Sequence, residues 1–356
     1  LSNIIPKGWF IPVSPGTKFI TVGGAIAADI HGKNHHLEGT LSKHLLWLEL
    51  LIHDGTIVRC SENENTALFR LTCGGMGLTG IILSASFRLK KIESDKIRYE
   101  KITASNLNDV MRLFEDSSAW TYSVAWIDCL AKGRSKGRSI LMRGEHATTN
   151  EAGKYFRKKM KKQKFSFPFY LPAFALNHFT AKAFNEFYYR VSSIPKQNQI
   201  SSFDFFFYPL DSILNWNRIY GKRGFTQYQF VLPMKSSYDG LNEILTFISG
   251  SGMGSFLAVL KLFGEENKNI LSFPMKGYTL ALDFPVTKKL FPLLNELDSI
   301  VADFGGRIYL AKDMRVRMEM LKRMYPRFEI FSEGIKKYNP DFRFRSLQSD
   351  RAGFTK

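Results

Sequence analysis

The segment Thr21–His36, with the sequence TVGGAIAADIHGKNHH, constrains this chain more than any other. Gly23 and Gly24 have no Cβ, so the backbone can turn sharply there and approach a ligand closely. A helix that starts at about Ala25 would place free N–H groups beside the turn, as an anion such as pyrophosphate requires. Taken alone, the segment fits better a tight turn whose histidines cap a helix or face solvent.

The histidine cluster of this segment, His-x-x-x-His-His from position 31 to 36, raises the question of a metal site. No carboxylate or cysteine stands at ligand spacing beside it, so no metal is expected. The three cysteines are scattered and contain no CxxC pair, which argues against a disulfide framework and fits a reducing compartment. They are Cys60, Cys73 and Cys129.

The net charge of +18, from 50 Lys+Arg against 32 Asp+Glu, predicts attraction to polyanions such as nucleic acid, anionic lipid or phosphate-bearing substrates. A basic surface kept for solubility would give the same count. With 356 residues, 44% of them hydrophobic, the chain can build two domains with their own cores. No uncharged apolar run is long enough to cross a bilayer, so any membrane contact is expected to be peripheral.

Up to about Lys91 the pattern predicts short strands broken by glycine and proline, an α+β arrangement with antiparallel pairing. Asp54-Gly55 is a hairpin signal between two of these strands. The predicted strands are Phe10–Val13, Phe19–Val22, Leu46–Ile52, Thr56–Arg59 and an alternating run at 82–89.

From about Glu93 the sequence becomes rich in aromatics and lysine, which predicts a second domain with one sheet covered by helices. The predicted strands are Phe205–Pro209, Phe225–Pro233, Ser255–Phe263 and Tyr278–Pro285. The predicted helices are Leu107–Phe114, Leu241–Ile248, Lys288–Phe304 and Arg315–Met324. The expected division is a first domain at 1–93, a second at 94–304, and a segment at 305–356 that returns to the first.

Gln227 and Gln229 stand two apart in a predicted strand, so both amides point to one face. Thr279, Ala281 and Asp283 share a face in the same way. Polar groups on one face of an otherwise apolar strand suit a sugar pocket, and they also suit a solvated sheet face.

The stretch from 15 to 89 resembles the second half of the FAD-binding domain of the vanillyl-alcohol-oxidase and p-cresol-methylhydroxylase flavoprotein family, most closely its decaprenylphosphoryl-ribose oxidase branch. The resemblance rests on PGT at 15–17, VGGAIAADIHGKNHH at 22–36, LLIHDGTIV at 50–58 and GGMGLTGIIL at 74–83. It continues through WNRIYG at 216–221, QYQFVLP at 227–233, KLFG at 261–264, LDFP at 282–285 and GGRIYLAKD at 305–313.

This resemblance implies an α+β chain: a partial p-cresol-methylhydroxylase-type FAD-binding domain, and a substrate-binding cap domain with an antiparallel sheet flanked by helices. Family members normally carry an earlier subdomain whose glycine-rich loop cradles the FAD diphosphate. No RGxGxSYG-like text occurs in this sequence, so the chain is expected to lack about a hundred residues of that domain.

The resemblance also implies roles for individual residues. Those expected at the flavin are Gly16, Thr21, Val22, Gly23, Gly24, Ala28, Asp29, Ile30, His31, Ile82 and Tyr309. Those expected to take part in catalysis are Lys312, His31 and Gln229. Those expected to bind substrate are Gln227, Gln229, Lys261, Lys33 and Asp283. A fixed ammonium such as that of Lys312 can stabilise negative charge on a reduced flavin and can bind a substrate oxygen.

The activity implied is FAD-dependent oxidation of a secondary hydroxyl of a sugar, the 2′-hydroxyl of a polyprenylphosphoryl pentose, with hydride transfer to flavin N5. The substrate would be a lipid-linked sugar phosphate, and a partner reductase would take the keto product. The alternatives are an aldonolactone or alditol oxidase, and a non-catalytic basic protein that binds anionic lipid or nucleic acid.

The stretch Lys154–Phe174 places a basic run directly before aromatic residues. Rings beside ammonium groups suit an anionic membrane surface. They could also stack on single-stranded nucleic acid, or form a solvated basic loop. The sequence predicts a cytoplasmic protein that is peripheral to the inner face of the membrane, with no nucleic-acid partner.

Overall fold

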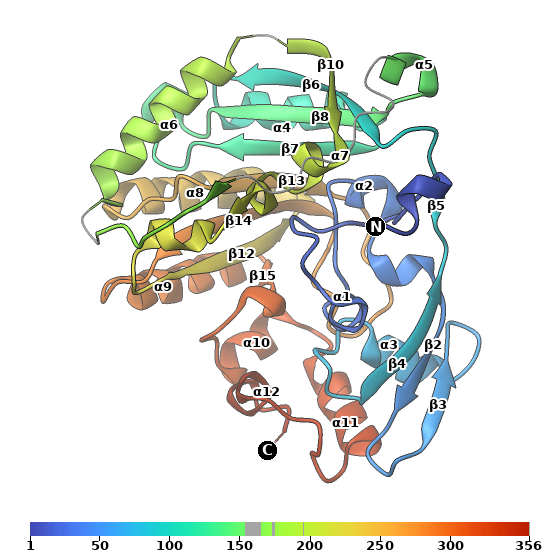
Figure 1. Ribbon diagram of the computed structural model, residues 1–356. Helices are drawn as coiled ribbons and strands as arrows, with labels where there is room; N and C mark the ends of the chain where they lie inside the picture. Colours follow the sequence, from blue (N-terminus) through green and yellow to red (C-terminus); the bar gives the residue numbers. More distant parts are fainter. Residues whose placement is uncertain (154–164, 173–174, 195, 356) are drawn as a thin grey trace.

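The computed structural model describes residues 1–153, 165–172, 175–194 and 196–355. The structure has two main bodies: a first body around a three-stranded sheet, and a larger, second body around an eight-stranded sheet. The C-terminal helices lie below the larger sheet beside the smaller one (Figure 1). None of the helices in these ranges combines the length and apolar character that crossing a bilayer requires.

The smaller sheet is antiparallel in the order β3-β2-β4. Its core combines apolar side chains of the strands with Ala25, Ile26, Leu68 and Phe69 from the helices packed on it. The turn predicted at Asp54-Gly55 joins β2 to β3. The elements are α1 (Val22–Ala27), α2 (His35–Glu38), β2 (Leu45–Leu51), β3 (Ile57–Cys60), α3 (Thr66–Thr72) and β4 (Ile81–Phe87), and β1 (Trp9–Phe10) pairs with β5 (Lys90–Lys91).

The larger sheet has the order β10-β6-β8-β7-β13-β14-β12-β15, with every neighbouring pair antiparallel. The predicted strands at 225–233, 255–263 and 278–285 are confirmed, while the strands before residue 203 were not predicted. The strands are β6 (Lys96–Ala104), β7 (Tyr122–Ile127), β8 (Ser139–His146), β10 (Lys196–Ser202), β12 (Phe225–Pro233), β13 (Ala258–Phe263), β14 (Gly277–Pro285) and β15 (Arg307–Ile308).

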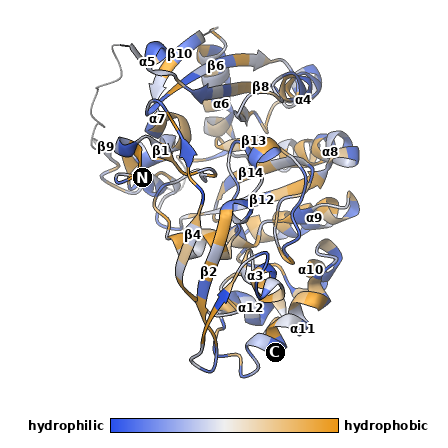
Figure 2. Cartoon of the chain, turned by 90° about the vertical axis from the view of Figure 1, so that its right-hand side faces the viewer, coloured by the Kyte–Doolittle hydropathy of each residue, from blue (hydrophilic) through white to orange (hydrophobic). Residues whose placement is uncertain are grey.

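Helices cover one face of this sheet and leave the other to the site. The predicted helices are confirmed as α4 (Leu107–Asp116), α8 (Ser237–Gly250) and α9 (Leu290–Asp303). Tyr278, Leu280, Leu282 and Phe284 are buried in one core with these helices. In Figure 2, α8 and α9 lie beside the strands and carry both hydrophobic and hydrophilic colours, as helices with one buried face do.

Three predicted strands differ from the structure. The run Phe10–Val13 is in a strand only at Phe10, where β1 ends. Phe19–Val22 forms no strand, because Thr21 caps α1 and the helix begins at Val22. The run Phe205–Pro209 lies in α7 (Phe203–Phe207) and a following 3-10 turn, Pro209–Ser212. The aromatic run contains both periods, but Phe203, Phe206 and Phe207 are buried at helical spacing. Tyr208, directly after α7, is buried as well.

The C-terminal segment contacts both bodies. β15 pairs with β12, whereas α11 (Phe328–Tyr338) packs on α3, where Gly334 faces Leu71. Gln348 of α12 (Leu347–Ala352) donates to the carbonyl oxygen of Leu310, at 2.7 Å. The domain boundaries at 93 and 304 stay a prediction. The helix predicted at Arg315–Met324 is α10 (Met318–Met324).

Candidate active site

The uncovered face of the larger sheet gathers polar side chains from three adjacent strands. Gln227 of β12 stands opposite Asp283 of β14, and Gln229 stands opposite Ala281. Lys261 of β13 lies on the same face, because its register partner belongs to the Asp283 row. The structure therefore brings together four of the five residues predicted to bind substrate.

His31 reaches this face from the loop after α1, and aromatic rings enclose it. Its ring centroid lies 4.8 Å from that of Phe263, 5.5 Å from Phe273 and 5.0 Å from Tyr309. Gln229 donates its amide to His31 Nε2, at 3.0 Å, so the imidazole proton is on Nδ1. Burial, with nearby Lys261 as a second cause, lowers the pKa of His31 well below its ordinary value, so the ring is neutral.

Charges on the face interact with one another. Burial and the Lys312 ammonium lower the pKa of Lys261 to about 8. Burial raises the pKa of Asp283 to about 6, although Gln227 donates to its carboxylate at 2.6 Å and Lys312 opposes the shift. Desolvation lowers the pKa of Lys312, and the nearby Asp283 carboxylate opposes this shift. The Lys312 side chain nevertheless keeps contact with solvent. The face thus holds two ammonium groups whose protons are less tightly held than those of surface lysines.

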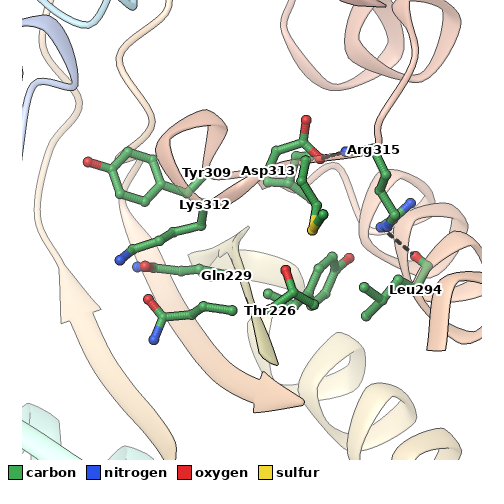
Figure 3. Close-up of a pocket in the computed structure, with 11 residues that line it drawn as sticks. Thr226, Gln229, Leu294, Tyr309, Lys312, Asp313 and Arg315 are labelled. Carbon is green, nitrogen blue, oxygen red and sulfur yellow. Dashed lines mark hydrogen bonds between the residues drawn. The ribbon is translucent and has the colours of Figure 1, made fainter. Parts of the chain in front are cut away.

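A pocket opens beside β12, where β15 has ended (Figure 3). In this view Lys312 runs alongside Gln229, and their polar ends point the same way. The loop that carries Lys312 is fixed by the last helix, since Arg351 pairs with Asp313 at 2.8 Å. The lining residues are Thr226, Gln227, Tyr228, Gln229, Leu294, Ile308, Tyr309, Lys312, Asp313, Met314 and Arg315.

Lys33, also predicted to bind substrate, has a different set of contacts. Its ammonium donates to the carbonyl oxygens of Phe206 and Phe207, at 2.8 and 3.1 Å, at the end of α7. Burial and Lys261 lower its pKa to about 7. In this structure Lys33 fastens α7 to the loop of the first body, so substrate binding by this group remains a prediction.

The predicted flavin segment leaves backbone accessible at the start of α1. Thr21, Val22 and Gly24 are exposed, although Thr21 Oγ1 already accepts from the Gly24 N–H, at 3.0 Å. Ile82 lies beside Gly23, 3.8 Å from where a Cβ would stand, and the space around Gly16 is open. The glycine pair is therefore the first turn of the helix, not a turn before it.

Other predicted flavin residues use their side chains within the protein. The Ile30 side chain is buried in the core of the first body. The Tyr309 hydroxyl donates to the carbonyl oxygen of Ala28, at 3.1 Å, and the ring stacks on Phe273 with centroids 4.6 Å apart. The backbone groups of Ala28 and Ile30 also have partners within the protein, since the Ala28 N–H donates to Gly24 and the Ile30 carbonyl oxygen accepts from Leu41. Tyr309 joins the two bodies.

Asp29, another predicted flavin residue, is fully buried, and its carboxylate joins the two bodies. Oδ1 accepts from the Ser42 N–H, at 3.1 Å. Oδ2 accepts from three side chains of the loop after β13: Asn267 at 2.7 Å, Asn269 at 2.9 Å and Ser272 at 2.7 Å. These contacts give Asp29 a structural role that the sequence pattern did not reveal.

The remaining histidines of the cluster also have structural contacts. His35 Nδ1 accepts from the Gly264 N–H at 3.1 Å, and His36 Nε2 donates to the carbonyl oxygen of Trp120 at 2.9 Å. A Cβ at Gly264 would meet the His36 carbonyl oxygen at 2.7 Å, which explains the glycine of KLFG. Within the described ranges, no three histidine, cysteine or acidic side chains converge as metal ligands would.

The residues present fit a flavin. His31 Nδ1 is buried and has no hydrogen-bond partner among the described residues, although it carries a proton. A buried donor without a partner on the polar face is what an acceptor-rich ring system would satisfy. FAD would be held by the open backbone around Gly16 and at Thr21–Gly24, with His31 and Ile82 alongside.

Comparisons with known proteins agree with this fit. A family model described as an FAD binding domain matches residues 1–61. The decaprenylphosphoryl-beta-D-ribose oxidase of Mycolicibacterium smegmatis is 37% identical over 98% of this chain and 76% of its own length. An uncharacterised protein in the mprA 5′ region of Streptomyces coelicolor is 31% identical over 98% of this chain and 97% of its own. The D-arabinono-1,4-lactone oxidase of Yarrowia lipolytica is 34% identical over only 19% of this chain.

These matches define an FAD-linked oxidoreductase whose cofactor is FAD. More particularly, the chain belongs to the family of the M. smegmatis decaprenylphosphoryl-beta-D-ribose oxidase, since the match runs through both bodies and the C-terminal segment. The predicted family, cofactor and α+β fold are confirmed.

Proposed function

We propose that this chain oxidises the 2′-hydroxyl of a polyprenylphosphoryl pentose. The observation that carries the proposal is the polar face on which Gln227, Gln229, Lys261 and Lys312 converge beside His31. The name of the M. smegmatis relative supports a ribose linked to decaprenyl phosphate as the substrate class. Only a short part of the chain matches the lactone oxidase, so that match gives the aldonolactone alternative less support.

The residues of the face suit the binding and orientation of a sugar. Gln227 and Gln229 present amides that can hydrogen-bond hydroxyl groups, and Gln227 is itself held by Asp283 at 2.6 Å. Lys261 offers an ammonium for a phosphate or hydroxyl oxygen. The neutral amine of Lys312, which its lowered pKa favours, would accept the proton of the reacting hydroxyl as the carbon loses its hydride. Bound FAD supplies the hydride acceptor, flavin N5.

Spectroscopy of the purified full chain tests the proposal. With FAD bound, visible flavin absorbance is expected to bleach on anaerobic addition of a polyprenylphosphoryl pentose, because hydride transfer reduces the ring. An aldonolactone and an alditol serve as comparison substrates. Bleaching by either of these but not by the lipid-linked pentose would favour the alternative oxidase, and protein that takes up no FAD would exclude both enzymes.

The pH dependence of substrate affinity tests Lys261. Because its pKa is lowered to about 8, the ammonium is present below that pH and lost above it. KM is expected to rise above pH about 8. In Lys261→Met, which is neutral throughout, KM should be higher at neutral pH and should lack this alkaline rise. The measurement is steady-state KM at neutral and alkaline pH. An identical rise of KM in both proteins would show that Lys261 does not bind the substrate.

The proposal includes two partners, a reductase for the keto product and an anionic membrane surface. A reductase that consumes the 2′-keto product would complete an epimerisation at that carbon, because oxidation removes the stereocentre. The basic stretch at 154–164 and the residues at 173–174, part of the predicted membrane surface, lie outside the described residues. Within the described part of that surface, Phe169 and Tyr170 are exposed.

A further inference from the structure

One helix of the larger body exposes an apolar stripe. The outer side of α6 (His178–Ser192) and the residues after it carries Phe179, Phe187, Val191 and Ile194, which are 80%, 66%, 51% and 60% exposed. The spacing of Phe179, Phe187 and Val191 at eight and four residues places these three on one side of the helix, and Ile194 follows its C-terminal end. A helix of a water-soluble domain normally turns such a stripe toward the core.

The opposite side of α6 is firmly packed, so the orientation of the stripe is fixed. Asn185 is buried and donates to Asp128 at 2.8 Å, while the Tyr188 ring packs on Trp126 with centroids 4.8 Å apart. The Asn177 side chain caps the helix start. Rotating the helix to bury the stripe would break these contacts. In Figure 1 the helix runs along the outer edge of the larger sheet.

Cations accompany the stripe. Lys182 and Arg190 are exposed on α6, and the only acid in the helix, Glu186, is paired with Arg138 at 2.7 Å and with Arg190. The whole chain carries +18. Rings and aliphatic groups flanked by ammonium and guanidinium groups match the boundary of an anionic bilayer, where apolar groups enter and cations meet headgroups.

A row of rings connects α6 with the candidate active site. Phe184 of α6 contacts Phe256 edge to face, with centroids 5.5 Å apart. Phe256 stacks on Tyr220 at 5.5 Å, and the Tyr220 hydroxyl donates to Asp283 at 3.4 Å. These contacts connect the helix that carries the stripe to Asp283 on the polar face.

We propose that the outer side of α6 docks this protein on an anionic membrane surface. The inference rests on the proposed function, because that substrate carries a polyprenyl chain that resides in the bilayer. It adds a specific docking element, α6, which the basic stretch before it does not define.

Vesicle co-sedimentation of the full chain tests the docking. The probes are vesicles of phosphatidylcholine with and without phosphatidylglycerol. Phe179→Ser/Phe187→Ser is expected to weaken partitioning into the anionic vesicles at least about tenfold, since two aromatic side chains no longer enter the interface. The matched control, Ile57→Ser/Leu347→Ser, removes two apolar side chains that are 59% and 87% exposed on other elements, and should bind as the unmodified chain does.

Three results would overturn the docking role: unchanged binding of the Phe179→Ser/Phe187→Ser variant, equal binding to vesicles without phosphatidylglycerol, or a dimer in sedimentation velocity that this variant dissolves. The last would assign the stripe to a second copy of the chain. Flavin bleaching by a short-chain, water-soluble prenylphosphoryl pentose separates the two proposals. It should be unchanged in the variant, and failure of this bleaching in the unmodified chain would remove the proposed function while leaving the vesicle result intact.

Discussion

Replacing Lys312 by alanine is expected to leave FAD bound but to slow reduction of the flavin by substrate about a hundred- to a thousandfold. The ammonium lies beside Gln229 at the mouth of the pocket, and it interacts with Asp283 and Lys261. Without it, the reacting hydroxyl loses the group that accepts its proton, and negative charge on the reduced ring loses the ammonium that this transfer forms. Anaerobic single-turnover absorbance measures the rate directly, and the flavin spectrum before mixing reports FAD occupancy.

Arginine at the same position separates two roles of the ammonium. Arginine keeps the positive charge but cannot give up its proton. If Lys312 only stabilises charge, Lys312→Arg should retain much of the rate, and if it exchanges a proton it should be as slow as Lys312→Ala. Lys322→Ala, which removes an exposed ammonium on α10, is the matched control. Single-turnover reduction that is unchanged in Lys312→Ala would refute both roles.

Replacing Asp29 by alanine is expected to lower the free energy of unfolding by about 3–5 kcal/mol. The carboxylate accepts from one backbone N–H and from three side chains, two of them buried. Alanine would remove the acceptor of the Ser42 N–H and of the Ser272 hydroxyl at the junction of the two bodies. Asn267 and Asn269 would each lose one of their acceptors. Equilibrium denaturation in urea measures the change.

Two further variants frame this result. Asp239→Ala removes an exposed acid from α8 and should change stability by less than about 0.5 kcal/mol. Asp29→Asn keeps the shape but turns an amide toward the donors of Asn267 and Asn269, so it should recover only part of the loss. A denaturation midpoint of Asp29→Ala that matches the unmodified chain would show that the network adds nothing to the junction.

The larger sheet was predictable where one period dominates the sequence. The runs at 225–233 and 277–285 alternate cleanly over nine residues each, which gives both the strands and their polar face. The run at 203–209 was not predictable, because FDFFFYP satisfies a helical and a strand period together. The helix forms because it buries Phe206 and Phe207 against side chains of the larger sheet. That packing involves residues distant in the sequence, so a local pattern does not reveal it.

The site was predictable within single strands and less so between them. Two amides on one side of a strand follow from its geometry, and the structure places them so. The contact of Gln229 with His31 joins residues 198 positions apart, and only the resemblance to flavoproteins put both in one site. The hydrogen bonds of Lys33 to α7 and of Asp29 to the loop after β13 depend on how the two bodies pack together. Residue spacing within the sequence therefore cannot predict them.

The Asp29 network also bears on how members of this family can exchange parts. The acceptor belongs to the first body and the donors Asn267, Asn269 and Ser272 belong to the second. The contacts of this junction therefore come from two distant parts of the sequence. Consider a recombinant protein that combines the first body of one family member with the second body of another. Its two bodies would form these hydrogen bonds only if the residue at position 29 and the loop at 267–272 match in acceptor and donors. In such recombinants we therefore expect the loop at 267–272 to fit only a partner with an acceptor at position 29.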